Sequence, residues 1–361
     1  MKYIWLLAAT CVLAGCGRDS NDEKRTNETA ESKPGAELAV DQDSLIFAEV
    51  TGENAPLDAS LSMLQTQVVL ERAGFSPGVI DGKMGKSLVL ALKSFQQAND
   101  IDTSGKLNTA TAEALRQFEV PATRLVKIPA GFAKGPFVPD FPDNAEDQAK
   151  LPALGYHNIM EALAERFHTT PETLIALNSP QTAVKAGSVI RVPNTADAPV
   201  PVLENDVRGW GRTLQLLGVA SDQPEVAKVV VDKSDGVLRA FDADGKIVAS
   251  FPATMGSSRD PLPLGTWTIK GVARNPEFHY NPELFWDVSD SESKVLLPPG
   301  PNGSVGVVWI DLSKPHYGIH GTSEPHTIGR AESHGCVRLT NWDAAKLAGM
   351  VKTGVKAVFQ K

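Results

Sequence analysis

Residues 316–339 read HYGIHGTSEPHTIGRAESHGCVRL and contain four of the seven histidines and one of the three cysteines. A cysteine attacks as its thiolate, so its pKa, ordinarily about 8.5, must be lowered by a neighbouring base or positive group. Gly335 leaves the backbone free to turn, so the amide N–H groups of His334, Gly335 and Cys336 could converge on one oxyanion. His320 lies sixteen residues before Cys336, and it can reach the thiol if the intervening loop folds back. This pattern predicts a nucleophilic cysteine served by a histidine base.

The other two cysteines belong to an N-terminal segment typical of exported proteins. The apolar stretch Tyr3–Leu13 is too short to span a bilayer but matches the core of a secretory signal. Leu13-Ala14-Gly15-Cys16 resembles the lipobox of bacterial lipoproteins, which implies removal of residues 1–15 and lipidation of Cys16. A plain signal peptide is the alternative. Export would leave Cys336 as a free thiol in a compartment that usually pairs its cysteines, which favours a chemical role for it.

Composition excludes several classes of protein. The chain has 361 residues, a formal net charge of −8, 42% hydrophobic residues and 22% charged residues. The length suggests about two to three domains, and the acidic balance argues against nucleic-acid binding. No apolar run of about 20 residues occurs, which excludes a polytopic membrane protein. Residues 17–44 carry many charges and no aromatic residue. We therefore expect residues 16–50 to be a lipid anchor and a disordered tether, of which the stretch 17–44 has an r.m.s. reach of roughly 30 Å.

A three-helix module is predicted between residues 57 and 120. Apolar residues three to four positions apart indicate the helices, and the glycine-punctuated loop Val79–Gly85 separates the first two. The segment LERAGFSPGVIDGKMGKSLVLALKSFQQAND (70–100) resembles the small peptidoglycan-binding module of wall hydrolases and transpeptidases. A helical spacer without binding function is the alternative. The predicted helix faces contain Leu61, Leu64, Val68 and Val69, then Leu88, Leu92 and Phe95, with a third helix at 109–118.

Residues 154–194 predict a second small module with the order strand–helix–helix–strand. Asn178 and the strand pattern GSVIRVP (187–193) follow two short amphipathic helices. This order resembles the LysM glycan-binding module, although the sequence marks its first strand poorly. Prolines around 136–152 and 195–202 indicate linkers on both sides. The two helices are marked by Ile159, Leu163 and Phe167, and by Leu174 and Leu177.

After residue 225 the apolar period changes to two, as expected for β-strands. Turns at Lys233–Gly236 and Asp242–Gly245 predict two consecutive hairpins, and Thr340–Asp343 has the capping pattern of a helix start. The sequence thus predicts a multidomain α+β protein whose C-terminal domain, 225–361, is mostly β. The remaining elements expected in this domain are strands at 267–272, 305–310, 317–320 and 355–359 and a helix at 341–352.

The C-terminal domain strongly resembles the L,D-transpeptidase catalytic domain. The family signature is a histidine, a short gap and then Ser/Thr-His-Gly-Cys, which correspond here to His320 and to Ser333-His334-Gly335-Cys336. PLPLGTWTI (261–269) also resembles the family's TPTGTFTI hairpin. The resemblance implies a β-sandwich or barrel with Cys336 as nucleophile. It also implies His320 as the general base, oriented by the backbone carbonyl of Gly321.

Supporting residues follow from the same resemblance. Ser333, His334 and Gly335 are expected to shape the catalytic turn. Arg338 is expected to meet a substrate carboxylate, although other family members carry Asn at that position, and Thr322 is placed with it in the substrate-binding surface. The aromatic stretch 278–286, which includes Trp286, could cover a bound stem peptide; packing of this segment on the barrel is an equal alternative.

Two weaker interpretations of the same residues can be weighed. His316 and His320 have the i, i+4 spacing of zinc ligands on a helix. The surrounding Pro315, Tyr317 and Gly318 favour a strand instead, along which four residues span roughly 13 Å. That distance is too long for two imidazoles to share one ion without a bend, so we expect no metal site. The other interpretation is a structural cysteine among surface histidines.

The resemblance implies a peptidoglycan L,D-transpeptidase that forms 3→3 cross-links during cell-wall biogenesis. Cys336 would attack the carbonyl between a diamino acid at position three and D-Ala at position four of a stem peptide. The side-chain amine of another stem peptide would then resolve the acyl-enzyme. With water as acceptor, the same site would make an L,D-carboxypeptidase or amidase. A non-catalytic wall-binding lipoprotein is the alternative from a different class.

The expected surroundings of the enzyme follow from these assignments. We expect no metal or organic cofactor, and peptidoglycan stem peptides and glycan as partners. The lipid bilayer is expected as a further partner through lipidated Cys16, and the chain is expected to be a monomer. The expected location is the cell envelope, as a periplasmic membrane-anchored lipoprotein. Gly17, which is not Asp, permits sorting to an outer membrane where two membranes exist.

Overall fold

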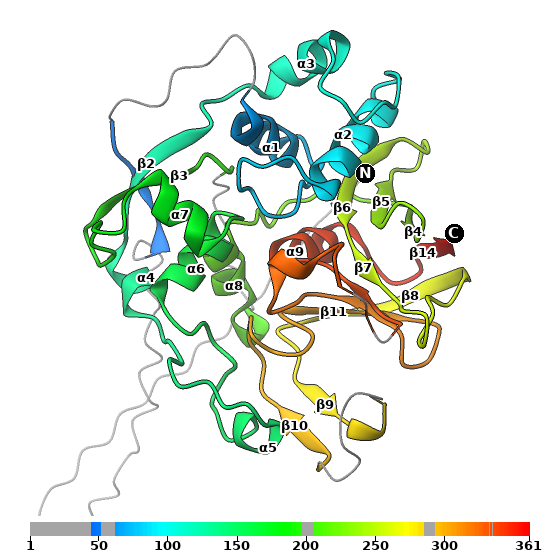
Figure 1. The fold of residues 1–361 in the computed structure, drawn as a ribbon. Helices are drawn as coiled ribbons and strands as arrows, with labels where there is room; N and C mark the ends of the chain where they lie inside the picture. The colour runs from blue at the N-terminus through cyan, green and yellow to red at the C-terminus, as the bar shows by residue number, and fades with distance from the viewer. Residues whose placement is uncertain (1–44, 52–61, 197–205, 285–292, 332, 334) are drawn as a thin grey trace, which may run out of the picture. The chain divides into compact units, whose positions relative to one another are not determined.

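The period-two pattern after residue 225 forms a nine-stranded sheet in the computed structural model, which describes residues 45–51, 62–196, 206–284, 293–331, 333 and 335–361 (Figure 1). The order is β6-β5-β4-β14-β8-β11-β12-β13-β7, and the pairs β4/β14 and β12/β13 are parallel while the others are antiparallel. The strands are β4 (Lys228–Asp232), β5 (Val237–Phe241), β6 (Ile247–Pro252), β7 (Thr254–Met255), β8 (Gly265–Arg274), β11 (Val308–Leu312), β12 (Gly318–His320), β13 (Val337–Arg338) and β14 (Lys356–Gln360).

This sheet curls back on itself. Strands β6 and β7 stand at opposite ends of the strand order, yet Ala253 alone separates them in the sequence. The two ends of the sheet are therefore held within one residue of each other, which requires a near-barrel. Both predicted hairpins are confirmed, since β4 pairs with β5 and β5 pairs with β6. The prediction of a mixed α+β chain with a mostly β C-terminal domain is confirmed.

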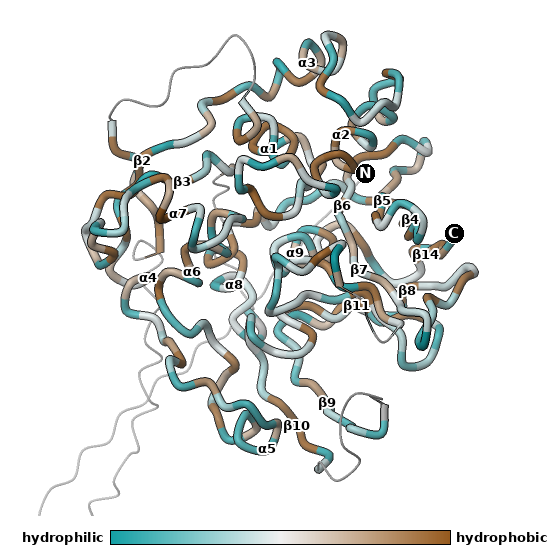
Figure 2. Tube along the Cα trace, viewed as in Figure 1, coloured by the Kyte–Doolittle hydropathy of each residue, from teal (hydrophilic) through white to brown (hydrophobic). Residues whose placement is uncertain are grey.

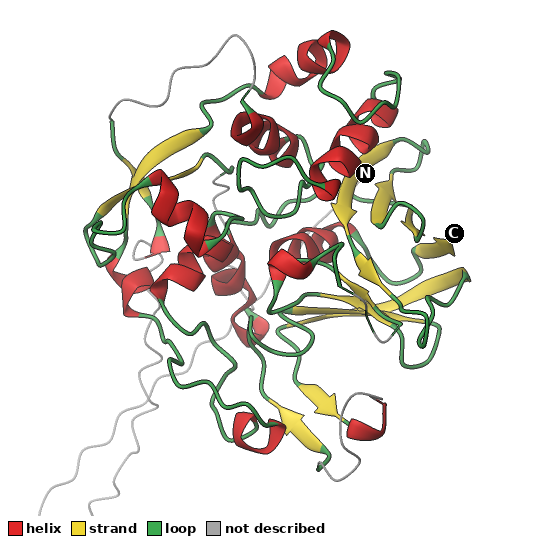
Figure 3. Ribbon diagram, in the orientation of Figure 1, coloured by secondary structure: helices red, strands yellow, loops and turns green. Residues whose placement is uncertain are grey.

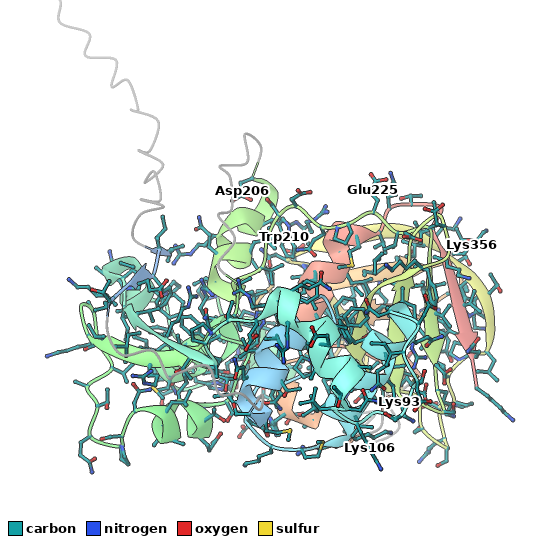
Figure 4. The ribbon with its side chains drawn as sticks, turned by 90° about the horizontal axis from the view of Figure 1, so that it is seen from above. Lys93, Lys106, Asp206, Trp210, Glu225 and Lys356 are labelled. Carbon is teal, nitrogen blue, oxygen red and sulfur yellow. The ribbon has the colours of Figure 1, made fainter. Side chains whose placement is uncertain are left out.

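Helix α9 (Asn341–Met350) lies against β11 and β12. Its predicted start is confirmed, because the Thr340 side chain accepts a hydrogen bond from the backbone N–H of Asp343 at 3.2 Å. The helix ends at Met350, before Gly354, which stands in the following loop with a φ of 98°. Trp342, the second residue of the helix, is fully buried. Figure 2 shows hydrophobic segments running through the strands of the sheet. Figure 4 shows the charged residues Glu225 and Lys356 on the outside of the C-terminal domain and Lys106 on the outside of the helical part that contains α2 (Lys86–Ala98) and α3 (Thr109–Leu115).

The predicted three-helix module is present. Its loop after the first helix is held by one buried side chain, Gln67, whose Oε1 accepts the N–H groups of Asp81 (3.1 Å) and Gly82 (2.7 Å). Ser62 and Asn108 cap the first and third helices through their side chains. The elements are α1 (Met63–Arg72), α2 (Lys86–Ala98), α3 (Thr109–Leu115) and the 3₁₀ turn η2 (Arg116–Phe118).

The middle of the chain forms a three-stranded sheet with helices, and here two predicted boundaries need correction. The strand that pairs with β3 (Val189–Pro193) is β2 (Thr123–Lys127), about thirty residues before the predicted module start at 154. The predicted tether extends too far, because β1 (Ala48–Glu49) pairs with β2, and Leu45 and Phe47 are buried. The helices here are α4 (Ala130–Lys134), α5 (Ala145–Gln148), α6 (Ile159–Arg166) and α7 (Pro171–Leu177).

Both differences have one physical reason. A strand as short as β2, which stands between Pro121 and Pro129, gives little local period-two signal, and its identity depends on the strand it pairs with. Leu45 and Phe47 likewise acquire their role from packing, since the Phe47 ring lies edge-to-face on Phe132 (4.9 Å) and Phe167 (5.1 Å). We call the unit formed by β1–β3 and α4–α7 the middle module.

The remaining described elements are a small strand pair, one helix and three 3₁₀ turns. A small antiparallel pair, β9 (Phe278–Tyr280) and β10 (Val295–Leu297), stands apart from the main sheet. Figure 3 shows most helices outside the C-terminal domain and most strands within it. The other short elements are the 3₁₀ turns η3 (Val207–Gly209), η4 (Pro282–Leu284) and η5 (Pro325–Thr327), and α8 (Trp210–Leu217).

One buried polar cluster contains side chains from all three modules. His168 Nδ1 lies 2.6 Å from Glu71 Oε1 in α1, and Lys346 Nζ in α9 contacts the same carboxylate oxygen. Burial opposes ionisation, but Lys346 and His168 together lower the pKa of Glu71 to about 2. Ser76 donates to Asp343 Oδ2 at 2.9 Å in the same region. The three-helix module and the middle module are therefore packed on helix α9 of the C-terminal domain.

Several predicted features lie outside the described residues. These are the signal segment, Cys16, nearly all of the tether, Trp286 and His334. Among the residues that the structure does describe, none of the helices is long and apolar enough to cross a membrane.

Candidate active site

Two parallel strands bring the predicted histidine and cysteine together. In the β12/β13 pair, Ile319 is opposite Val337 and His320 is opposite Arg338. Ile319 and Val337 are fully buried in the core, so their neighbours face the other side of the sheet. Cys336 directly precedes β13 and shares that outer side with His320 and Arg338. The loop between the two strands, which includes η5, folds back as predicted, so that β13 pairs with β12.

The imidazole of His320 is fixed on two sides. Its Nδ1 lies 2.7 Å from the carbonyl oxygen of Gly321, so Nδ1 carries the proton and donates it. Trp309 of β11 stacks on the ring with 5.5 Å between centroids and 22° between planes. The residue is 5% exposed. Burial, together with the positive charge of Arg338, lowers the pKa of His320 to about 4 against the opposing bond to Gly321. The Nε2 atom is therefore a neutral proton acceptor at pH 7.

The thiol of Cys336 is half-buried and rests neutral. Its Sγ points to the backbone carbonyl of His316 at 3.8 Å. Burial raises the pKa of the Cys336 thiol, while a backbone bond from Gly318 and the charge of Arg338 act in the opposite direction. A neutral thiol beside a neutral imidazole cannot rely on a preformed ion pair. Proton transfer from sulfur to His320 must accompany attack on a carbonyl.

The turn before Cys336 is held by Ser333 and Gly335. The Ser333 hydroxyl donates to the carbonyl of Cys336 (2.6 Å) and accepts the N–H of Gly256 (2.6 Å). Gly335 has a φ of 97°, and a Cβ there would lie 2.7 Å from the Tyr317 ring. Both conformation and space therefore require glycine at 335. His334 lies outside the described residues, so the predicted convergence of amide groups stays a prediction.

A single cavity of about 850 Å³ contains the predicted catalytic pair and both described substrate-binding candidates. The Nε atom of Arg338 is buried and has no hydrogen-bond partner among the described residues, which suits it to meet a carboxylate. Thr322 is 7% exposed and its hydroxyl accepts the N–H of Glu324 at 3.2 Å. The lining includes His320, Cys336, Arg338, Thr322, Trp309 and Tyr317.

The aromatic segment of the predicted cover contributes to this cavity. Phe278 and Tyr280 of β9 line it together with His279. Trp286, the residue named for the lid, lies outside the described residues, and its role stays a prediction. His316 lines the cavity next to β12 with a φ of 67°, while His326 is exposed on the intervening loop. In the part of the chain that the structure describes, no group of three or more His, Cys, Asp or Glu side chains could hold a metal ion.

Two residues of the site carried no recognisable sequence signal. Trp309 stacks on His320 from a neighbouring strand, and its position is set by the β11/β12 register, in which it is opposite His320. Asn341 begins α9 and lies against Gly321: a Cβ on that glycine would be 2.3 Å from Asn341 Oδ1. The capping pattern predicted the helix that Asn341 begins, but a tertiary contact gives the residue its role.

Comparison with known proteins agrees with this geometry. A family model described as the L,D-transpeptidase catalytic domain, YkuD, matches residues 227–359. The chain carries an L,D-transpeptidase catalytic domain. A second model, described as "Putative peptidoglycan binding domain", matches residues 62–115. The predictions of an L,D-transpeptidase, an acyltransferase with a cysteine nucleophile, and of an N-terminal peptidoglycan-binding module are thereby confirmed.

The curated relatives cover part of this chain. "Putative L,D-transpeptidase YkuD" of Bacillus licheniformis is 26% identical over 55% of this chain and 90% of its own length. The protein of the same name from Bacillus subtilis is 46% identical over 33% of this chain, which spans 57% of that relative. Among solved structures, an L,D-transpeptidase from Mycobacterium smegmatis is 23% identical, with a TM-score of 0.31, over 38% of this chain and 59% of that one.

Proposed function

We propose that this L,D-transpeptidase joins peptidoglycan stem peptides through a Cys336 thioester to give 3→3 cross-links. The observation that carries the proposal is that the His320 imidazole, whose Nδ1 is bound to Gly321 and whose Nε2 has no hydrogen bond to a described residue, lines the same cavity as Cys336. The buried Nε of Arg338 in that cavity supplies a positive group for a stem-peptide carboxylate. The donor is a tetrapeptide ending in D-Ala.

Cys336 and His320 account for every proton and leaving group in the reaction. As Sγ bonds to the carbonyl carbon of residue three, the thiol proton moves to His320 Nε2. The tetrahedral intermediate then collapses, the peptide bond to D-Ala breaks, and the imidazolium protonates the leaving amine. The side-chain amine of a second stem peptide attacks the thioester and gives its proton to His320, and the Cys336 thiolate leaves and regains a proton. No cofactor enters these steps.

Transfer to an amine, and not to water, is the finer part of the proposal. Phe278 and Tyr280 on β9 form an aromatic wall of the cavity, and such a wall reduces the access of water to the thioester. With purified tetrapeptide muropeptide as donor, mass analysis should show more 3→3 dimer than tripeptide. A product mixture of tripeptide alone, at every donor concentration, would instead assign the chain as an L,D-carboxypeptidase or amidase.

Two further modules support delivery to the wall. Residues 62–115 match the peptidoglycan-binding family model, and we propose that the middle module is a LysM-like glycan binder. Its support is the pair of helices α6 and α7 between the antiparallel strands β2 and β3, with the short helices α4 and α5 inserted after β2. A cavity of about 590 Å³ lined by Phe137, Ile159, Val184 and others adds to it. An apolar groove of this kind suits the faces of sugar rings.

We also propose that the enzyme is a monomeric, membrane-anchored lipoprotein of the cell envelope, held through Cys16 and in the outer membrane where there are two. The lipobox-like Leu13-Ala14-Gly15-Cys16 motivates this. Cys16→Ser should move the protein from the membrane to the soluble envelope fraction without changing its activity on soluble muropeptides. A wild-type protein that fractionates as soluble, with an N-terminal peptide of unmodified mass, would contradict the anchor.

A further inference from the structure

Asn341, the first residue of α9, is fully buried and uses its whole side chain in hydrogen bonds. Its Oδ1 accepts the N–H of Val307 at 3.2 Å. Its Nδ2 donates to Glu165 Oε1 (3.1 Å) and Oε2 (3.2 Å) and to the carbonyl of Pro301 (3.1 Å). A buried amide with these partners has little freedom to rotate or shift.

This amide defines where Gly321 can lie. A Cβ on Gly321 would be 2.3 Å from Asn341 Oδ1 and 3.4 Å from the Cα of Gly306, so the glycine backbone is packed directly on the amide. The carbonyl of the same glycine accepts the proton of His320 Nδ1 at 2.7 Å. Displacement of Asn341 would therefore be transmitted to the group that selects the tautomer and orientation of His320.

Glu165 supports Asn341 from outside the catalytic domain. It lies in α6 of the middle module, ahead of the matched residues 227–359, and is 5% exposed. The Tyr156 hydroxyl donates to its Oε2 at 3.0 Å. Burial, with a smaller contribution from the charge of Glu161, raises the pKa of Glu165 to about 8, so the carboxyl is largely neutral at pH 7. A neutral carboxyl avoids most of the cost of burying a charge there.

The middle module also holds a wall of the catalytic cavity. The N–H of Leu154 donates to Pro299 O at 2.9 Å, and the N–H of Asn302 donates to Leu154 O at 3.0 Å. Asn302 Nδ2 donates to Glu161 Oε1 at 3.0 Å. The segment held in this way leads directly to Ser304 and Val305, which line the cavity. Two independent sets of contacts thus join the middle module to the active site.

We propose that Glu165 is a positioning residue for catalysis, acting through Asn341 and the carbonyl of Gly321 on His320. The middle module is then a structural part of the active site, whether or not it binds glycan. This inference rests on the proposed role of His320 as the base, and it assigns a function to a residue that the catalytic family match does not contain.

The test compares full-length variants by D-Ala release from tetrapeptide. Glu165→Ala removes the acceptor of Asn341, and kcat should fall about tenfold or more while KM stays within about twofold, since small displacements of a catalytic group are costly. In Glu165→Gln the side-chain oxygen can still accept from Asn341 Nδ2, and the side-chain NH2 group can donate to the Tyr156 hydroxyl. The kcat of this variant should therefore lie within about threefold of wild type. If Glu165→Ala does not fold, Glu165→Asp should lower kcat at least about threefold, because its shortened carboxyl withdraws from Asn341.

A matched control separates positioning from a general loosening of the modules. Lys346→Met removes another buried contact between α9 and an N-terminal module, the one to Glu71, but it does not touch Gly321. Its kcat should stay within about twofold of wild type. Equal losses of kcat in Lys346→Met and Glu165→Ala, or an unchanged kcat in Glu165→Ala, would overturn the proposal.

A second readout does not depend on the substrate. Alkylation of Cys336 by iodoacetamide at pH 7, followed by peptide mass, reports assistance from His320 directly. Glu165→Ala should slow alkylation in the same direction as His320→Ala, and Lys346→Met should leave it unchanged. If wild type releases no D-Ala but this pattern holds, the proposed reaction fails and the positioning role stands. An alkylation rate in Glu165→Ala equal to wild type would overturn the positioning role.

Discussion

Replacing Cys336 with alanine should abolish D-Ala release and dimer formation while leaving the fold intact. The change removes the one sulfur in the catalytic cavity among the described residues, so no thioester can form. The thiol is half-buried and lies on a turn, and its removal opens no large cavity in the core. The measurement is D-Ala release from tetrapeptide, with a thermal melt of each variant.

The activity of this variant distinguishes a cysteine nucleophile from a zinc site. A Cys336→Ala protein that retains more than a few per cent of wild-type activity would refute the nucleophile assignment. Inhibition of the wild type by a chelator would favour the zinc interpretation of His316, His320 and Cys336. Cys16→Ser serves as the matched control, because it removes a cysteine that stands 320 positions before Cys336 in the sequence.

His320→Ala should lower kcat/KM roughly 100-fold or more, in line with the loss of a general base. During acylation the imidazole accepts the thiol proton and protonates the departing D-Ala, and during deacylation it takes the proton of the acceptor amine, so both stages should slow. His326 provides the control, since it is exposed on the loop between the two strands. His326→Ala should stay within about twofold of wild type. A loss in His326→Ala as large as that in His320→Ala would contradict the assignment of the base.

The pH profile gives an independent view of the same residue. Burial and Arg338 lower the pKa of His320 to about 4. A base works in its unprotonated form, and lowering its pKa extends that form to more acidic pH. The acid limb of kcat/KM in the wild type should therefore fall well below the ordinary histidine pKa of about 6.5. A midpoint near 6.5 would mean that His320 is solvated during catalysis or is not the base.

Much of the site was predictable because its determinants are local in sequence. The Gly335-Cys336 pair, the Ser333 that braces it and the histidine at the end of a strand stand within one short segment. Turn residues at Lys233–Gly236 predicted the β4–β5 hairpin, and Thr340 predicted the start of α9. In each case the interaction that sets the conformation joins residues a few positions apart. The local sequence pattern is therefore enough to predict the structure.

Other features could not be predicted in this way. Strand β2 is recognisable only by its pairing with β1 and β3, and Leu45 and Phe47 are core residues only because Phe132 and Phe167 meet them. Trp309 reaches His320 through strand register. The buried cluster of Glu71, His168 and Lys346 unites three modules that the sequence presents as separate units.

By itself, the sequence determined the reacting groups and the β-rich domain that presents them, since both depend on residue types at short spacing. Only the tertiary structure decided how the histidine is held: Glu165 and Asn341 are 176 residues apart in the chain, yet they hydrogen-bond behind Gly321. Such a pair leaves no local trace, because a buried carboxyl and a buried amide each acquire their role from the partner that replaces water.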